Sequence, residues 1–408
     1  MHLAFLYPQL KKLTGAQRLI LWLAQYAVSA GVPVTLITHH LSDEPRTALA
    51  PGVALVETGQ RVDYTGNHYA DAALEYVLAP SLIKYIPNDA TALVGFGPPT
   101  MPALWWAKRQ GWGGPTRPLL AFLYEPPRFV DRDRGDVAVG LGIPGGIAQP
   151  LFAGYRQIDR RLVRAADALL ANGVYGAARL REAYGHEATV IPHGVDFTEP
   201  SAEAVTAMRA QYHIPIDAPL LLSVNQLHPR KRLDLFIRTL AAVRQRYPTV
   251  RGMLVGRGVD EGRLRTEARL RGVTDALTFT GFVPDADLAA LYRAATVYLH
   301  TGRDETFGLS VLEAAWSGLP VVAVDEGGPR EILEDNAGDT LGSLAPATVD
   351  ALAAAVLNVL DNTAHARERA MVAQTRVRAR YSWEAGAHAL IEAVARTSAA
   401  HTTDEKAR

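Results

Sequence analysis

The chain has 408 residues, more than one ordinary hydrophobic core holds, so its length predicts two domains. It carries 42 basic and 42 acidic residues, and this balance argues against a nucleic-acid-binding role. There is no cysteine, which excludes disulfides, thiolate catalysis and cysteine-based metal sites.

Short apolar runs alternate with helical stretches from the first residues onward. Leu3–Tyr7 is predicted to be a strand and Val32–Thr38 the next one, with a helix at Ala16–Ala30 between them. This strand–helix–strand order predicts a parallel sheet with helices on its faces. The helix and second strand account for the apolar run at 19–38 better than a membrane span does. Since the chain also starts without the basic residues of a signal peptide, we expect a cytoplasmic protein.

The same alternation restarts after residue 215. We expect strands at 220–224, 252–255, 277–280, 296–300 and 320–324, and helices at 233–246, 263–271, 287–295 and 308–317. Two α/β units in tandem, joined near the polar segment 196–216, are the simplest interpretation. A ligand would bind at the carboxyl ends of the strands, in the cleft between the units.

Two glutamates in the second half stand where a sugar nucleotide could bind. Glu305 precedes a helix whose first turn is predicted to hold Phe307, Gly308 and Leu309, and Glu313 lies further along that helix. The unpaired N–H groups of a first turn suit a phosphate, and a glycine lets the ligand approach closely. Glu313 could accept hydrogen bonds from a ribose, and Glu305 from a sugar ring. The alternative is that Glu305 only supports the helix dipole and Glu313 is a solvated surface residue.

A basic loop follows the strand expected at 220–224. Arg230, Lys231 and Arg232 lie at the start of the next helix, where cations oppose the helix dipole. A basic cluster in such a place indicates a bound anion, and a solvated basic turn is the alternative.

In their order along the chain, these motifs resemble the retaining glycosyltransferases of the GT-B fold, called family 4 or group 1. That family's signature is a Glu, seven residues and a second Glu, with Phe-Gly after the first Glu and Gly-x-Pro-Val-Val after the helix. Here these are Glu305, Phe307-Gly308, Glu313 and residues 318–322. Three further motifs match, namely Val255-Gly256-Arg257-Gly258, Gly281-Phe282-Val283 and Gly327-Gly328-Pro329-Arg330-Glu331.

The resemblance implies an α/β architecture of two Rossmann-like, doubly wound domains that face a central cleft. Residues 1–196 would form the acceptor-binding domain and residues 197–380 the donor-binding domain. A helix at 381–398 would return toward the first domain, and 399–408 would form a polar tail.

The implied reaction is metal-independent transfer of a hexosyl group, with mannosyl among the candidates, with retention of the anomeric configuration. The partners would be a nucleotide diphosphate sugar and a glycan, lipid-linked or small-molecule acceptor, with no metal or other cofactor. Lys231 would bind the diphosphate and Glu305 would face the sugar. The other donor-side positions implied are Gln226, Arg230, Arg257, Phe282, Val283, Phe307, Gly308, Leu309 and Glu313. Gln226 stands where relatives usually have an arginine.

Candidates on the acceptor side come from the first half. Gly15 takes the place of the family's glycine-containing loop, with an ordinary helix start as the alternative. Tyr124, Glu125 and Arg128 match a segment of mannosyltransferase-like relatives, although Tyr124 replaces a histidine and cannot act as a base near neutral pH. A proline-rich turn is the alternative there. His193 lies near the domain crossing, where it either faces the acceptor or belongs to a structural hinge.

The segment 137–155 has no charged residue and precedes Arg156, Arg160, Arg161 and Arg164. It could be a lid over the acceptor, a plain loop, or a loop that touches the inner face of a membrane. Other functions also stay open. A nucleotide-sugar epimerase or a phosphorylase can share this architecture, and an inactive protein could bind a sugar nucleotide without turnover.

Overall fold

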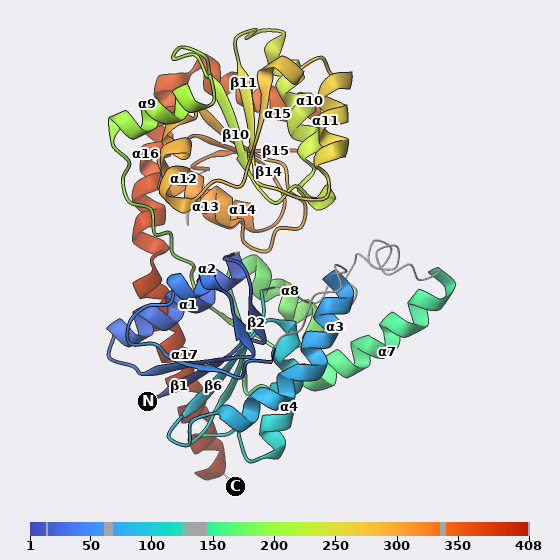
Figure 1. Cartoon of the computed structure of the whole chain (residues 1–408), viewed down its shortest axis with the longest axis vertical. Helices are drawn as coiled ribbons and strands as arrows, with labels where there is room; N and C mark the ends of the chain where they lie inside the picture. Colours follow the sequence, from blue (N-terminus) through green and yellow to red (C-terminus); the bar gives the residue numbers. More distant parts are fainter. Residues whose placement is uncertain (14, 61–67, 125, 127–144, 335–339, 407–408) are drawn as a thin grey trace. The chain divides into compact units, whose positions relative to one another are not determined.

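The computed structural model of the chain (Figure 1) describes residues 1–406 except 14, 61–67, 125, 127–144 and 335–339. The predicted site residues Glu125 and Arg128 lie outside the described residues. The chain forms two compact units, one of Met1–Gly194 together with the segment from Ser382 onward, and one of Val195–Tyr381. In the described part of the chain, no helix has the length and apolar character needed to cross a bilayer.

The first unit is built on a parallel sheet of seven strands, in the order β5-β3-β1-β6-β7-β8-β9. The strands are β1 Leu3–Leu6, β3 Val34–Thr38, β5 Ala54–Glu57, β6 Ala92–Phe96, β7 Leu119–Phe122, β8 Ala168–Ala171 and β9 Ala188–Val190. A short parallel pair, β2 Gln9–Leu10 and β4 His40–Leu41, lies beside it. Leu3 and Phe5 pack into one core and Ala4 and Leu6 into another, so both faces of the sheet are covered.

Helices cover this sheet on both faces (Figure 1). They are α1 Gly15–Ser29, α2 Asp43–Thr47, α3 His68–Leu78, α4 Met101–Arg109, α7 Gly145–Val163, α8 Val174–Tyr184 and α17 Trp383–Lys406, with 3-10 turns at Ala79–Tyr85 and Pro98–Thr100. Because α7 begins at Gly145, much of the charge-free segment 137–155 is helical. The expectation of a loop is therefore wrong for residues 145–155, whereas a role as a lid or in membrane contact stays a prediction.

The last helix, α17, belongs to the first unit. Its Trp383 ring lies 6.2 Å from the ring of Trp22 on α1. Gly386 faces the backbone of the segment after β9, and a Cβ there would lie 2.6 Å from the carbonyl oxygen of Pro192. Glycine at position 386 therefore lets the helix sit directly on that segment.

The helix is also longer than expected. The sequence predicted a helix at 381–398 and a polar tail after it, whereas α17 continues to Lys406. Residues 396–406 contain neither glycine nor proline, so nothing in the local sequence ends the helix earlier.

The second unit has a parallel sheet of six strands in the order β12-β11-β10-β13-β14-β15. The strands are β10 Leu220–Val224, β11 Arg251–Val255, β12 Leu277–Gly281, β13 Val297–His300, β14 Val321–Val324 and β15 Ser343–Ala345. The helices are α9 Ala202–Gln211, α10 Leu233–Arg244, α11 Glu261–Leu270, α12 Asp285–Ala294, α13 Leu309–Trp316, α14 Gly328–Leu333, α15 Val349–Asp361 and α16 Thr363–Arg380, with 3-10 turns at Pro229–Lys231 and Thr274–Ala276.

Each unit is doubly wound, as the sequence predicted. In the second unit, Leu220 and Leu222 of β10 pack into one core and Leu221 into the other. The strand order runs outward from β10 in both directions, with β11 on one side and β13 on the other. In such sheets a ligand binds beyond the carboxyl ends of the strands where the order reverses. In the second unit that place lies between the loops that follow β10 and β13.

Candidate functional site

The loops after β10 and β13 bring three of the predicted residues together. Lys231 donates a hydrogen bond to Oε1 of Glu305, and Nη1 of Arg230 lies 3.7 Å from the same oxygen. All three side chains are largely buried, with 13% of the Glu305 side chain exposed. Two cations therefore share one carboxylate at the point where the strand order reverses.

Backbone contacts hold these two loops against each other. The hydroxyl of Thr301 donates to the carbonyl oxygen of Lys231 at 2.8 Å, and the N–H of Arg303 donates to the carbonyl oxygen of Arg230 at 3.1 Å. The positions of Arg230 and Lys231 are therefore fixed by the loop that carries Glu305.

Arg232 has a different task from its two neighbours. Its backbone takes a left-handed conformation, with φ of +46°, and it precedes α10. Its guanidinium donates to the carbonyl oxygen of Thr301 at 2.9 Å and to Oε2 of Glu326 at 2.9 Å. Its charge is thus neutralised inside the unit, and we assign it a structural role.

Glu305 is ionised across the physiological range. Burial alone would raise the pKa of its carboxyl group, but the charges of Lys231 and Arg230 outweigh burial and lower the pKa to about 2. With two cations and one anion, the cluster has one positive charge in excess. An anionic ligand such as a phosphate would balance that charge.

Helix α13 begins at Leu309, later than the sequence predicted. Gly308 has φ of +94° and caps the helix, so Phe307 and Gly308 are not part of the first turn. Phe307 is buried, and its ring packs 5.7 Å from the ring of Tyr381. The N–H groups without intrahelical partners begin at Leu309. A side chain at position 308 would lie 3.1 Å from Pro329, so this glycine is explained by its φ and by that contact.

Glu313 is buried on α13, with 6% of the residue exposed. The hydroxyl of Tyr292, on α12, donates to its Oε2 at 2.8 Å. The alternative that Glu313 is a solvated surface residue is therefore wrong. Sequence reasoning missed Tyr292, since no local pattern links it to a carboxylate 21 residues away.

The glycine motifs of this unit let backbone segments approach each other. A Cβ at Gly256 would clash with the carbonyl oxygen of Asn225, and one at Gly258 would clash with that of Leu227. The loop after β11 thus lies directly against the loop after β10, which carries the basic residues.

The second glycine pair works in the same way beside Glu305. The N–H of Gly328 donates to the carbonyl oxygen of Glu305 at 2.7 Å. A Cβ at Gly327 would lie 2.5 Å from that same oxygen. Both glycines therefore fix the backbone that presents the Glu305 carboxylate.

The remaining donor-side candidates differ in exposure. Gln226 and Arg257 are exposed in the loops after β10 and β11. Phe282 is 54% exposed, which is unusual for an aromatic side chain, whereas Val283 is buried in the core. Val283 therefore supports its neighbours by packing, and the other three are available to a ligand.

On the acceptor side, Tyr124 lies just after β7 in the first unit. Its hydroxyl donates to the carbonyl oxygen of Ala16, near the start of α1 at Gly15, over 3.4 Å. Burial raises the pKa of Tyr124 well above its ordinary value, so the hydroxyl stays protonated. Sequence reasoning missed Tyr7, which follows β1 and accepts a hydrogen bond from Gln17 at 3.1 Å. Its place directly after the carboxyl end of the first strand is the signal that could have identified it.

His193 is buried in the first unit, with 4% of the residue exposed. Its ring lies 5.6 Å from the ring of Trp383 in an edge-to-face arrangement. Burial lowers its pKa to about 4, so it is neutral at physiological pH. This packing favours the hinge interpretation.

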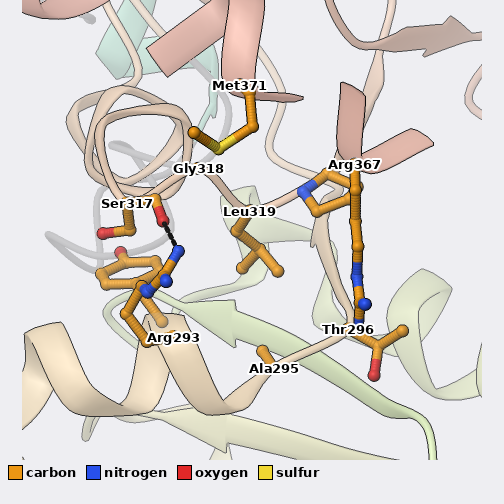
Figure 2. A pocket seen from close by; sticks show the side chains of 10 residues that line it. Arg293, Ala295, Thr296, Ser317, Gly318, Leu319, Arg367 and Met371 are labelled. Atoms are coloured by element: carbon orange, nitrogen blue, oxygen red, sulfur yellow. Dashed lines mark hydrogen bonds between the residues drawn. The ribbon is translucent and has the colours of Figure 1, made fainter. Parts of the chain in front are cut away.

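A cavity of about 340 Å³ lies elsewhere in the second unit, near the amino ends of β13 and β14 (Figure 2). It is lined by Tyr292, Arg293, Ala295, Thr296, Ser317, Gly318, Leu319, Pro320, Arg367 and Met371. Nη1 of Arg293 donates to the carbonyl oxygen of Ser317 at 3.2 Å, as the dashed line in Figure 2 shows. Helices α12 and α13 end at this cavity, which is away from the carboxyl ends of the strands where Lys231 and Glu305 lie.

Comparisons with known proteins point to one family. Residues 205–378 match the family model described as glycosyl transferases group 1, and residues 13–199 match the one described as glycosyltransferase family 4. The chain is 34% identical over 254 residues to a D-inositol 3-phosphate glycosyltransferase of Kineococcus radiotolerans, an alignment that covers 57% of this chain and 58% of the relative. It is 32% identical over 243 residues to a glycogen synthase of Mycobacterium tuberculosis, covering 59% and 56%. The alignments thus span little more than half the length of these curated relatives.

Solved structures of the same fold cover nearly the whole chain. A sucrose-phosphate synthase of Thermosynechococcus elongatus superimposes with a TM-score of 0.74 at 21% identity, over 98% of this chain and 99% of that one. HepE of Anabaena, solved in complex with UDP and glucose, gives a TM-score of 0.69 at 21% identity, over 96% and 98%. At such identities the likeness shows the fold alone. It confirms the predicted GT-B architecture of two Rossmann-like domains.

Proposed function

The chain belongs to the group 1 glycosyltransferases, and from that premise we propose that it transfers a hexosyl group from a nucleotide diphosphate sugar to an acceptor hydroxyl group, with retention of the anomeric configuration. The observation that carries the proposal is the cluster of Lys231, Arg230 and Glu305 where the strand order reverses. It combines a surplus cation for a diphosphate with a carboxylate for the sugar.

Each predicted group has a task in donor binding. Lys231 and Arg230 bind the diphosphate, together with the N–H groups at the start of α13. The Glu313 carboxylate, oriented by Tyr292, accepts hydrogen bonds from the ribose. Glu305 accepts hydrogen bonds from the hydroxyl groups of the transferred sugar. The exposed Phe282 ring is available to the nucleotide base.

In the proposed reaction, the bond between the anomeric carbon and the phosphate oxygen breaks, and its electron pair leaves with the diphosphate. The acceptor oxygen forms the new bond on the same face of the sugar. A phosphate oxygen of the leaving diphosphate takes the acceptor's proton. Lys231 and Arg230 stabilise the charge that gathers on the diphosphate, while Glu305 stabilises the cationic character of the ring.

In this proposal the acceptor binds to residues of the first unit. Tyr7 and Tyr124 supply hydroxyl groups there, and both follow strands of the sheet. The relatives named above are a D-inositol 3-phosphate glycosyltransferase and a glycogen synthase, so a small polyol and a glycan are the two acceptor classes to try first. Mannosyl stays among the candidate donor sugars. A cytoplasmic location is part of the same proposal, with peripheral membrane contact through α7, which carries the exposed Arg161 and is followed by the exposed Arg164.

A binding screen followed by a transfer assay tests the proposal. A nucleoside diphosphate that binds the native state raises the melting temperature, by mass action, and UDP, GDP and ADP can be compared directly. The matching nucleotide sugars are then incubated with inositol phosphates and with glucans, and the anomeric proton couplings of the product report its configuration. A product of inverted configuration, or an epimerised donor without transfer, would overturn the proposal. Binding without any turnover would identify an inactive sugar-nucleotide-binding protein.

We expect transfer to be unaffected by EDTA. The charges that balance the diphosphate are side chains of the protein, so removal of divalent cations should leave kcat unchanged. The measurement is the initial rate after exhaustive chelation, with and without added Mg²⁺ or Mn²⁺. Complete loss of activity that is restored by either cation would count against this mechanism.

A further inference from the structure

His300 is a buried residue that the proposed reaction does not use. It ends β13 and is completely inaccessible to solvent. Neither of its ring nitrogens has a hydrogen-bond partner among the residues that the structure describes. Buried polar atoms in folded proteins are nearly always paired, and an orphaned one is costly. His300 lies at the end of the strand that leads to Glu305. We therefore expect its ring nitrogens to gain a hydrogen-bond partner in another state of the protein.

Gly302 brings His300 and Glu305 to the same point. A Cβ on Gly302 would lie 2.9 Å from Nε2 of His300 and 3.3 Å from Cγ of Glu305. The two side chains thus flank the place where any other residue would carry its own side chain. Gly302 does not have a positive φ, so backbone conformation does not explain this glycine. The contact with the two flanking side chains does.

Four charged groups surround the ring. Burial lowers the pKa of His300 to about 4, Glu305 opposes that shift, and Lys231, Arg232 and Arg230 add to it. The ring is consequently neutral at physiological pH, and one nitrogen carries a proton. A neutral imidazole can donate one hydrogen bond without adding a charge to the site.

We propose that His300 is a positioning residue for Glu305. When the diphosphate of the sugar nucleotide binds Lys231 and replaces Glu305 as its partner, the Glu305 carboxylate accepts a hydrogen bond from Nε2–H of His300. The inference rests on the proposed function, in which Lys231 binds phosphate. In this structure Lys231 satisfies the carboxylate. A buried carboxylate that loses its cation needs another donor. Nε2 of His300 has no hydrogen-bond partner among the described residues. It lies beside Gly302, at the same place that the Glu305 side chain approaches.

His300→Phe keeps a ring in place and removes the donor. Since a hydrogen bond to a charged group contributes about 1.5–3 kcal/mol, we expect kcat to fall at least about tenfold. Affinity for the nucleoside diphosphate should also fall, because the hydrogen bond forms only when the diphosphate binds Lys231 and therefore contributes to binding. The acid limb of the kcat profile should move to higher pH, because a carboxylate that loses a hydrogen bond to its ionised form has a higher pKa. His300→Asn retains a donor and should restore both kcat and the acid limb in large part. His365→Phe, at an exposed histidine on α16, is the matched control.

A merely structural His300 predicts another pattern. The melting temperature and kcat of His300→Phe would fall, the acid limb would not move, and His300→Asn would rescue nothing; that result, or an unchanged kcat, would overturn the proposal. If His300→Phe does not fold, Gly302→Ala tests the same contact, because its methyl group would displace the ring.

A second readout separates this inference from the proposed function. The Glu305 carboxyl carbon can be followed by ¹³C NMR at saturating UDP or GDP, with the signal identified by its loss in Glu305→Gln. If the wild type transfers no sugar, the proposed reaction fails, yet His300→Phe must still raise the pKa of Glu305 in the nucleotide complex. An unchanged pKa there would reject the role of His300. A protein that binds no nucleotide would overturn both proposals.

Discussion

Replacing Glu305 with glutamine should lower kcat by about 10²-fold or more, the size typical of one electrostatic contact in a transition state. Glutamine keeps the shape and removes the charge, and the charge is present in the wild type because the pKa of Glu305 is held at about 2. Cationic character develops on the sugar only as the phosphate departs, so the loss appears in kcat. Steady-state kinetics with saturating donor measures it.

Nucleoside diphosphate affinity of Glu305→Gln should not fall. The substitution removes the carboxylate that competes with phosphate for Lys231 and Arg230. Isothermal titration checks this, with Glu368→Gln at an exposed position of α16 as the matched control. An unchanged kcat would make Glu305 a helix-start carboxylate without catalytic consequence. A large loss of affinity would place it on the nucleotide instead of the sugar.

Lys231→Ala should weaken nucleoside diphosphate binding by about 2–4 kcal/mol, the cost of truncating one partner of a buried charge pair. That corresponds to roughly 30-fold to 10³-fold in Kd. We expect this loss of affinity because Lys231 is largely buried and its backbone is held by the hydrogen bond from the Thr301 hydroxyl. Titration calorimetry with the best nucleoside diphosphate from the binding screen gives the value.

Lys84→Ala, at an exposed lysine of the first unit, controls for the loss of one positive charge. Glu313→Ala provides a second probe of the same placement, since it removes the acceptor proposed for the ribose. Wild-type affinity in both Lys231→Ala and Glu313→Ala would show that the nucleotide binds elsewhere.

The elements of the second unit were predictable because glycine and proline separate them. The strand expected at 220–224 is β10 itself, and the helix expected at 287–295 corresponds to α12, Asp285–Ala294. The predicted start of α13 was less accurate. Its first residues fit a helical pattern, but Gly308 takes a φ of +94°, which a sequence pattern does not specify.

The contacts inside the site were harder to predict than the residues in it. Lys231 and Glu305 were both expected to bind the donor, yet their mutual ion pair spans 74 residues of sequence. It forms because β13, and not the next strand along the chain, lies on that side of β10. Local periodicity carries no information about this order. The burial of His300 depends on it too, since that residue ends the same strand.

Among the glycines of the family motifs, only Gly308 was given a physical reason from the sequence. The sequence suggested that Gly308 makes room for a ligand, whereas a side chain there would meet Pro329. Likewise, Gly256 and Gly258 let two loops of the protein touch. A glycine pattern shows that something comes near, and only the three-dimensional structure shows what.

During synthesis, the unit that opens the chain is the one that must finish last. Domains generally fold as units while the chain emerges, with the N-terminal part first. Here, however, the unit Val195–Tyr381 is inserted in the sequence between the two segments of the other unit. That other unit is completed only by α17. Until residues 383–406 have been made, α1 lacks the helix whose Trp383 packs beside Trp22. The inserted unit can therefore fold on the ribosome before the seven-stranded sheet of the first unit is covered by its last helix.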